Sequence, residues 1–266
     1  MSDAAPLESR DAAAPGLDAE APDRGALPPL EPEAPVPPLR DRVWEVLARP
    51  RAAFARHDGR WGVLGPWAVV AAVSLVLAVG VFARVDLDAR IKAGWERVSS
   101  SERAGMRGLT DDQRDQAARV VAFFEKAKWV LAPLGALASL VLWGLVAFGA
   151  CHLLSPRRPD LLRCLSVSAY SGLAGAVGDA AQLAAVLLGR APDGTGPATL
   201  VDPLGSPHLH SALARLDPAL LFGYGLFAIG LTASCGLERR RAYGLCGAVW
   251  LVLSAAAVGL AAAGAA

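Results

Sequence analysis

The stretch GVLGPWAVVAAVSLVLAVGVFA, residues 62–83, decides the fold, because its 22 residues include no charged side chain. A helix rises about 1.5 Å per residue, so this segment is long enough to cross about 30 Å of hydrocarbon. Four further stretches have the same character, at about residues 129–154, 164–189, 219–237 and 242–264. The sequence therefore predicts an all-α integral membrane protein with a five-transmembrane-helix bundle over residues 62–264.

The composition of the whole chain agrees with this prediction. Of its 266 residues, 54% are apolar and 19% are charged, and the mean hydropathy is +0.38. These values indicate a chain much less polar than an ordinary soluble domain. The net charge of +1 excludes a strongly basic nucleic-acid-binding protein. We therefore expect a lipid bilayer, and not a nucleic acid, as the partner of the chain.

Residues 1–38 form a segment of different composition. They contain nine prolines, eight acidic residues and two arginines. Such a segment cannot bury enough apolar surface to offset the entropy of ordering, so it is predicted to be a disordered, acidic Pro/Ala-rich tail. It has neither the basic start nor the apolar core of a signal peptide, which predicts that it stays in the cytoplasm.

Residues 39–61 precede the first span and are predicted to form an amphipathic helix at the membrane interface. Val43, Val46, Leu47 and Phe54 recur at helical spacing among arginines, which is typical of a helix at headgroup level. Trp44 and Trp61 are candidate interfacial anchors. The alternative is a short helix that packs on the protein's own loops. Pro50 is expected to break or kink any continuous helix here.

A polar outer loop is predicted at residues 84–128. Its second half begins with Thr110 as a candidate N-cap, followed by two aspartates that suit the positive end of a helix dipole. We expect a polar helix there that runs on, or bends at the membrane surface, into the second span.

Short basic turns predict the topology. The turn between spans two and three and the turn between spans four and five are rich in arginine, whereas the longer connection 190–218 holds only two arginines. Short basic turns mark the cytoplasmic side, so the N-terminus is predicted inside and the C-terminus outside. The arginines that set topology and can contact anionic lipid are Arg157, Arg158, Arg239, Arg240 and Arg241.

Asp179 is the one Asp, Glu, Lys or Arg within the five predicted spans. A carboxylate near the bilayer midplane costs about 2.5–3.5 kcal/mol on insertion scales, so a reason for its presence is expected. It shares a small and polar helix face that suits either close helix packing or transport. The candidate residues of this face are Ser168, Ser171, Gly172, Gly175, Gly178, Asp179 and Gln182.

Asp217 and Pro218 are predicted to begin the fourth span. An aspartate can cap the exposed amides of a helix, and proline suits the first helical position. A catalytic or ion-binding Asp217 is the alternative. His208 and His210, with Asp202 or Asp217, could supply zinc ligands, but the sequence favours a solvated loop as the explanation of the two histidines.

The four cysteines each lie near the predicted cytoplasmic end of a span. These residues are Cys151, Cys164, Cys235 and Cys246. A four-thiolate metal or cluster site is geometrically conceivable, but no CxxC pair is present. Thiols on a reducing face are more often small buried residues, so the sequence predicts no bound metal or cofactor.

Three segments together resemble the bacterial branch of the Yip family, the Ypt/Rab-interacting membrane proteins. They are LARPRAAFAR at 47–56, LLRCLSVSAYSGLAGAVGDAAQLAAVLLG at 161–189 and HSALARLDPALLFGYGLFAIGLTAS at 210–234. The resemblance covers about residues 40–264. It implies a five-helix membrane domain with a cytosolic N-terminus and, in the eukaryotic branch, binding to Rab-type GTPases and a related membrane partner in vesicle traffic.

The sequence and this resemblance favour a non-enzymatic membrane scaffold or trafficking factor in the bacterial inner membrane. It would act through lipid, another membrane protein or a second copy, and its tail could recruit a cytoplasmic protein. The alternative is a transporter component for a small molecule, ion or lipid, centred on Asp179. A metalloenzyme built from His208, His210 and Asp217 is a third possibility, although the chain lacks P-loop, HExxH and GxSxG motifs.

Overall fold

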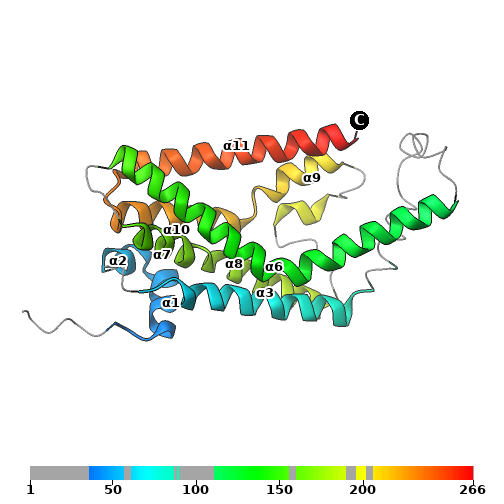
Figure 1. The fold of residues 1–266 in the computed structure, drawn as a ribbon, viewed down its shortest axis with the longest axis horizontal. Coiled ribbons are helices and arrows are strands. Elements are labelled where there is room, and N and C mark those ends of the chain that lie inside the picture. The colour runs from blue at the N-terminus through cyan, green and yellow to red at the C-terminus, as the bar shows by residue number, and fades with distance from the viewer. Residues whose placement is uncertain are drawn as a thin grey trace, which may run out of the picture. The chain divides into compact units, whose positions relative to one another are not determined.

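The computed structural model describes residues 36–56, 61–86, 89, 111–155, 160–189, 196–201 and 206–265. Within these ranges every regular element is a helix (Figure 1), which confirms the all-α fold class. The predicted tail, residues 1–38, lies almost entirely outside them. The elements are α1 (Leu39–Ala48), α2 (Pro50–Ala55), α3 (Leu64–Arg84), α6 (Asp111–Leu154), α7 (Leu161–Ser171), α8 (Leu173–Leu187), η1 (Pro197–Leu200), α9 (Pro207–Ala214), α10 (Pro218–Ala233) and α11 (Arg239–Ala265).

Four stretches are long and apolar enough to cross a membrane as single helices. They are Leu64–Arg84, Val130–Leu154, Leu161–Leu187 and Arg239–Ala262. A fifth crossing exists if His208–Ala214 and Pro218–Ala233, which meet at a 45° bend, form one broken span. The chain is therefore a multi-span integral membrane protein with four or five crossings.

The fourth span differs from the prediction of one helix over residues 219–237. Helix α10 has 16 residues, about 24 Å of rise, which is short for a crossing. Asp217 and Pro218 begin a new helix, so α9 cannot continue into it. At the other end Gly236 has a φ of +69°, and the amide of Leu237 donates to the carbonyl of Leu231 at 3.1 Å. This turn ends the helix before residue 237.

Helix α6 is one continuous helix of 44 residues that contains Pro133. It begins at Asp111, so residues 111–128 of the predicted polar outer loop are helical and run directly into the second span. Residues 90–110, with the candidate cap Thr110, lie outside the described part of the chain.

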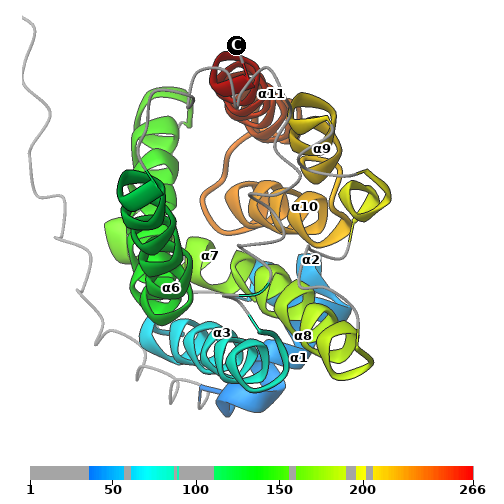
Figure 2. The ribbon, with the colours of Figure 1, turned by 90° about the vertical axis from the view of Figure 1, so that its right-hand side faces the viewer.

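The helices pack with α7 on the inside and α11 at the edge. Figure 2, a view along the helices, shows α3, α6, α8 and α10 around α7. Helix α11 packs against α9 and α10. The buried residues follow this arrangement: 56% of the apolar stretch of Leu161–Leu187 is buried, against 6% for Arg239–Ala262. The third span is thus the core of the bundle, and the last span is mostly exposed to its surroundings.

The segment before the first span folds against the bundle. Arg49 ends α1 and Pro50 begins α2, so the segment forms two short helices. Val46 and Phe54 are fully buried. Trp61, a predicted interfacial anchor, is 5% exposed. Its ring packs edge-on to that of Tyr170, and the two ring centroids are 5.4 Å apart. The apolar stripe therefore faces the helices of the bundle, and not loops as in the alternative prediction.

Trp44 is the aromatic side chain of α1 that faces outward, with 71% of its surface exposed. Arg40, Arg49 and Arg51 are exposed on the same two helices. A tryptophan beside arginines is typical of a membrane–water interface. We still predict that α1 and α2 lie at headgroup level, because their outer face carries this tryptophan and these arginines.

Candidate functional site

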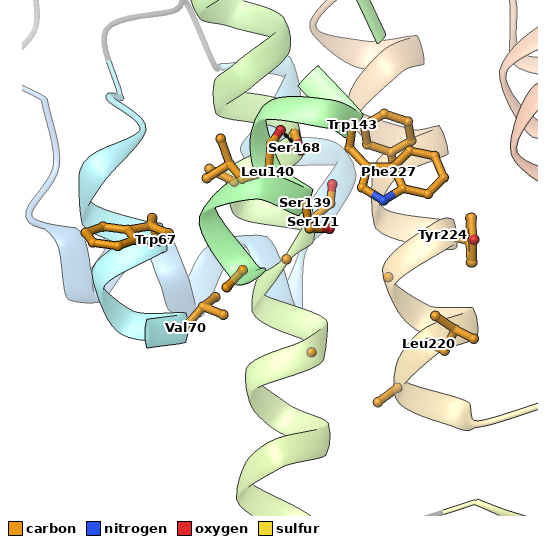
Figure 3. Close-up of a pocket in the computed structure, with 16 residues that line it drawn as sticks. Trp67, Val70, Ser139, Leu140, Trp143, Ser168, Ser171, Leu220, Tyr224 and Phe227 are labelled. Atoms are coloured by element: carbon orange, nitrogen blue, oxygen red, sulfur yellow. Dashed lines mark hydrogen bonds between the residues drawn. The ribbon is translucent and has the colours of Figure 1, made fainter. Parts of the chain in front are cut away.

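A cavity of about 280 Å³ lies between the first three spans and α10. Its wall is mostly apolar and aromatic. Figure 3 shows Trp67 and Val70 of α3 on one side, residues of α6 and α7 in the middle, and Leu220, Tyr224 and Phe227 of α10 on the other side. Glycines leave room where the helices meet: no atom lies within 4 Å of a Cβ built at Gly175.

Aromatic contacts hold the α6 and α10 sides of this cavity together. The indole of Trp143 packs edge-on to the rings of Tyr224 and Phe227, with ring centroids 5.5 Å and 5.3 Å apart, respectively. Edge-to-face pairs at this separation contribute about 0.5–1.5 kcal/mol each beyond area burial. The cavity is thus bounded by fixed aromatic groups.

The cavity has few polar groups. The Ser168 hydroxyl donates to the carbonyl of Leu140 at 2.9 Å and the Ser171 hydroxyl to that of Val167 at 2.7 Å, which leaves both oxygens able to accept. The buried indole N–H of Trp67 has no hydrogen-bond partner. This arrangement suits a small, largely apolar molecule.

The structure divides the predicted small-residue face among several neighbours. Ser168, Ser171, Gly172 and Gly175 line the cavity. Gly178 lies instead against α10, where an added Cβ would be 2.8 Å from Cβ of Ala219. Gln182 is half-buried. A central helix touches helices on several sides, so one sequence stripe does not meet a single partner.

Asp179 does not line the cavity but joins the first and third spans. The hydroxyl of Ser74 on α3 donates to Asp179 Oδ2 on α8 at 2.5 Å. Sequence reasoning missed Ser74 as the partner, although it is the one hydroxyl residue within 62–83. That uniqueness was the available signal, since a hydroxyl is a rare hydrogen-bond donor in an apolar span.

Asp217 and Pro218 lie at the start of α10. Oδ1 of Asp217 accepts hydrogen bonds from the amides of Ala219 at 2.8 Å and Leu220 at 3.3 Å, and Pro218 is the first helical residue. The Asp217 carboxylate is thus engaged by backbone amides.

The histidines do not form a metal site with Asp217. His208 is exposed, whereas His210 Nδ1 lies 3.1 Å from the carbonyl oxygen of Ala198 and 3.2 Å from that of Val201. In the described residues, His208, His210 and Asp217 do not gather as a ligand group. Asp202 lies outside those residues.

Three of the four cysteines meet at one end of the bundle. The sulfur atoms of Cys151, Cys164 and Cys235 all lie within 4.8 Å of one another. Cys246 on α11 is 5% exposed and is not part of this group. Of the four cysteines expected near the cytoplasmic ends of the spans, three therefore meet in space and Cys246 lies apart from them.

The arginines at the start of α11 lie at the surface. Arg239, Arg240 and Arg241 are exposed. The guanidinium of Arg241 donates to the carbonyl of Leu154 at 2.9 Å, which ties α11 to the end of α6. Arg157 and Arg158 of the other basic turn lie outside the described residues.

Comparison with known proteins gives one result. The Yip1 domain family model matches residues 44–260, which is most of the chain and extends from within α1 to within α11. No curated protein and no solved structure matches the chain. Because the match covers the described bundle and its membrane-spanning helices, the chain belongs to the Yip1 domain family of membrane proteins.

Proposed function

We propose that this protein is a non-enzymatic membrane scaffold that acts by binding another membrane protein or a second copy of itself. The observation that supports this proposal is an open stripe of small residues on α11. Gly244, Ala248, Ala255 and Gly259 are exposed and recur at intervals of four, seven and four residues, so they share one helix face.

This face has the properties of a helix-docking surface in a membrane. No atom lies within 4 Å of a Cβ built at Gly244 or Gly259, and Leu251, between the two pairs, is 60% exposed. Small residues let two helix backbones approach closely. Close packing of this kind is important for helix association in membranes, because the hydrophobic effect does not drive helices together in lipid. The stripe on the third span is used within the bundle, whereas the stripe on α11 is left for a partner.

Bulky substitution of this stripe tests the proposal. Ala255→Leu with Gly259→Leu is expected to reduce at least tenfold the amount of a specific membrane protein, or of a differently tagged second copy, that co-purifies from native membranes. Protein abundance should not change, because nothing in the described bundle packs there. Val79→Leu is the matched control, since Val79 is 60% exposed on α3. Unchanged co-purification in the α11 variant would contradict the proposal.

We place the protein in a bacterial inner membrane with its N-terminus in the cytoplasm and its C-terminus outside. The bent pair α9–α10, counted as a fifth span, gives the odd number of crossings that this topology needs. Arg163 and Arg241, from the two basic turns, both bond to backbone carbonyls at the same end of the bundle. In this orientation the acidic tail is available to recruit a cytoplasmic protein.

A transporter or lipid-binding component is the second candidate, because the bundle contains a mostly apolar cavity of about 280 Å³. In this alternative Asp179 would bind or relay the transported species. The contact with Ser74 favours a packing role instead, since the carboxylate is engaged by a neighbouring span and does not reach the cavity lining.

Substitution at Ser74 and Asp179 separates the two roles. Ser74→Ala and Asp179→Leu should each lower thermal stability in detergent micelles by about 0.6–1.7 kcal/mol, the range of intramembrane hydrogen bonds. Asp179→Asn keeps an acceptor for Ser74 and should stay near wild type in both stability and abundance. A transport or lipid-exchange phenotype lost in Asp179→Asn at unchanged abundance would favour the transporter.

A further inference from the structure

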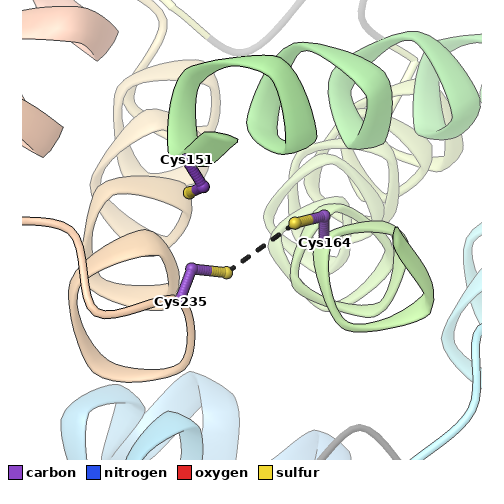
Figure 4. A group of neighbouring side chains, drawn as sticks. All are labelled: Cys151, Cys164 and Cys235. Atoms are coloured by element: carbon purple, nitrogen blue, oxygen red, sulfur yellow. Dashed lines mark hydrogen bonds between the residues drawn. The ribbon is translucent and has the colours of Figure 1, made fainter. Parts of the chain in front are cut away.

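The three cysteines that meet at the end of the bundle form a site of defined geometry. Cys151 lies in the last turn of α6, Cys164 lies in the first turn of α7, and Cys235 follows α10 (Figure 4). Their exposed fractions are 0%, 0% and 1%. Three thiols from three separate segments are thus brought together in the protein interior.

The sulfur separations suit a bound metal ion and not a disulfide. The Sγ atoms of Cys164 and Cys235 are 3.9 Å apart, far beyond the about 2.05 Å of an S–S bond. A metal ion bound by thiolates lies about 2.3 Å from each sulfur, so three sulfurs around it in a plane are about 4.0 Å apart. The three sulfur atoms, which lie within 4.8 Å of one another, would need to move only slightly closer together to bind a central ion.

The surroundings hold the turn that carries Cys235 in place. The hydroxyl of Ser155 donates to the carbonyls of Cys235 at 3.2 Å and Gly236 at 3.3 Å. The hydroxyl of Ser234 donates to the carbonyl of Phe54 at 2.8 Å. Groups that fix the position of ligand residues in this way reduce the cost of assembling a metal site.

A cation is anchored beside the same turn. The guanidinium of Arg163, the residue before Cys164, donates to the carbonyl of Ser234 at 3.3 Å. This contact ties the start of α7 to the turn that carries Cys235.

From this geometry we propose that Cys151, Cys164 and Cys235 bind one Cu(I) ion in a three-coordinate, all-sulfur site. Each coordinating thiol gives its proton to water when the ion binds. Thiolates select soft ions. Within the described residues no fourth His, Cys, Asp or Glu joins the group, whereas structural zinc takes four ligands and iron–sulfur clusters take four cysteines.

Titration of the full chain tests the proposal, with Cu(I) buffered by a chromogenic chelator under reducing conditions in detergent micelles. We expect one Cu(I) per chain and a raised Tm on binding. Cys151→Ser, Cys164→Ser and Cys235→Ser should each weaken binding more than about 100-fold, since loss of even an outer-shell partner costs about 10–100-fold. Cys246→Ser, another buried cysteine outside the group, is the matched control and should bind as wild type.

X-ray absorption of the copper-loaded wild-type protein provides a test that does not depend on the folding of variants. It should show three sulfur ligands and no nitrogen or oxygen ligand. Absence of stoichiometric Cu(I), binding that survives Cys164→Ser, an equal loss in Cys246→Ser, or preferential binding of Zn²⁺ would each overturn the proposal.

Discussion

Phe54→Ala is expected to lower the free energy of unfolding by about 3–5 kcal/mol, the usual cost of removing a buried phenylalanine. Phe54 of α2 is fully buried and lies against α10, where a Cβ built at Gly230 would be 3.3 Å from its ring. Its carbonyl also accepts the hydroxyl of Ser234. The substitution leaves a cavity between the segment before the first span and the bundle.

Thermal unfolding in detergent micelles measures this effect. Trp44→Ala is the control on the neighbouring helix α1, because Trp44 is 71% exposed and exposed positions usually change stability by less than about 0.5 kcal/mol. If α1 and α2 do not pack against the bundle, Phe54→Ala and Trp44→Ala will have similar thermal stability. That result would contradict the packing described for this segment.

Gly144→Leu is expected to destabilise the contact between α6 and α7 by about 1–3 kcal/mol or more, as for other overpacked positions. A Cβ at Gly144 would be 3.1 Å from Cα of Leu165 and closer still to its side chain. Backbone atoms cannot move aside as a side-chain end can. The two helices would have to separate, and this would also displace Cys164 from Cys151.

Gly149→Leu is the matched control on the same helix, since no atom lies within 4 Å of a Cβ built there. Both variants remove one glycine from the helix and add the same side chain, so their difference reports the helix contact alone. Thermal unfolding measures the difference directly. Equal stability of the two variants would show that α6 and α7 do not approach each other at Gly144.

The membrane class and the position of most spans could be predicted from the sequence because hydrocarbon requires long uncharged helices, and residues 62–83 meet that requirement without reference to any other segment. Asp217 and Pro218 correctly predict that a helix begins at this point, which is where the break between α9 and α10 lies. What they could not indicate is that α10 also ends early, at the turn around Gly236.

The candidate sites were less predictable because they depend on which helix faces meet. The polar face around Asp179 was identified, but its hydrogen-bond partner Ser74 lies 105 positions away. Cys151, Cys164 and Cys235 were placed at one membrane face, yet only packing decides that they converge and that Cys246 does not. The open stripe on α11 resembles the stripe on the third span in composition, but the stripe on the third span borders the cavity and contacts α10.

Site-specific photo-crosslinking in native membranes tests most directly whether α11 docks a partner. A photoreactive residue placed at Ala255 should give a discrete crosslinked species of higher mass that contains a membrane protein or a second copy of this chain. The same residue at Val79, exposed on α3, should give none. Recovery of only the monomer from both positions, or the same products from both, would contradict the account.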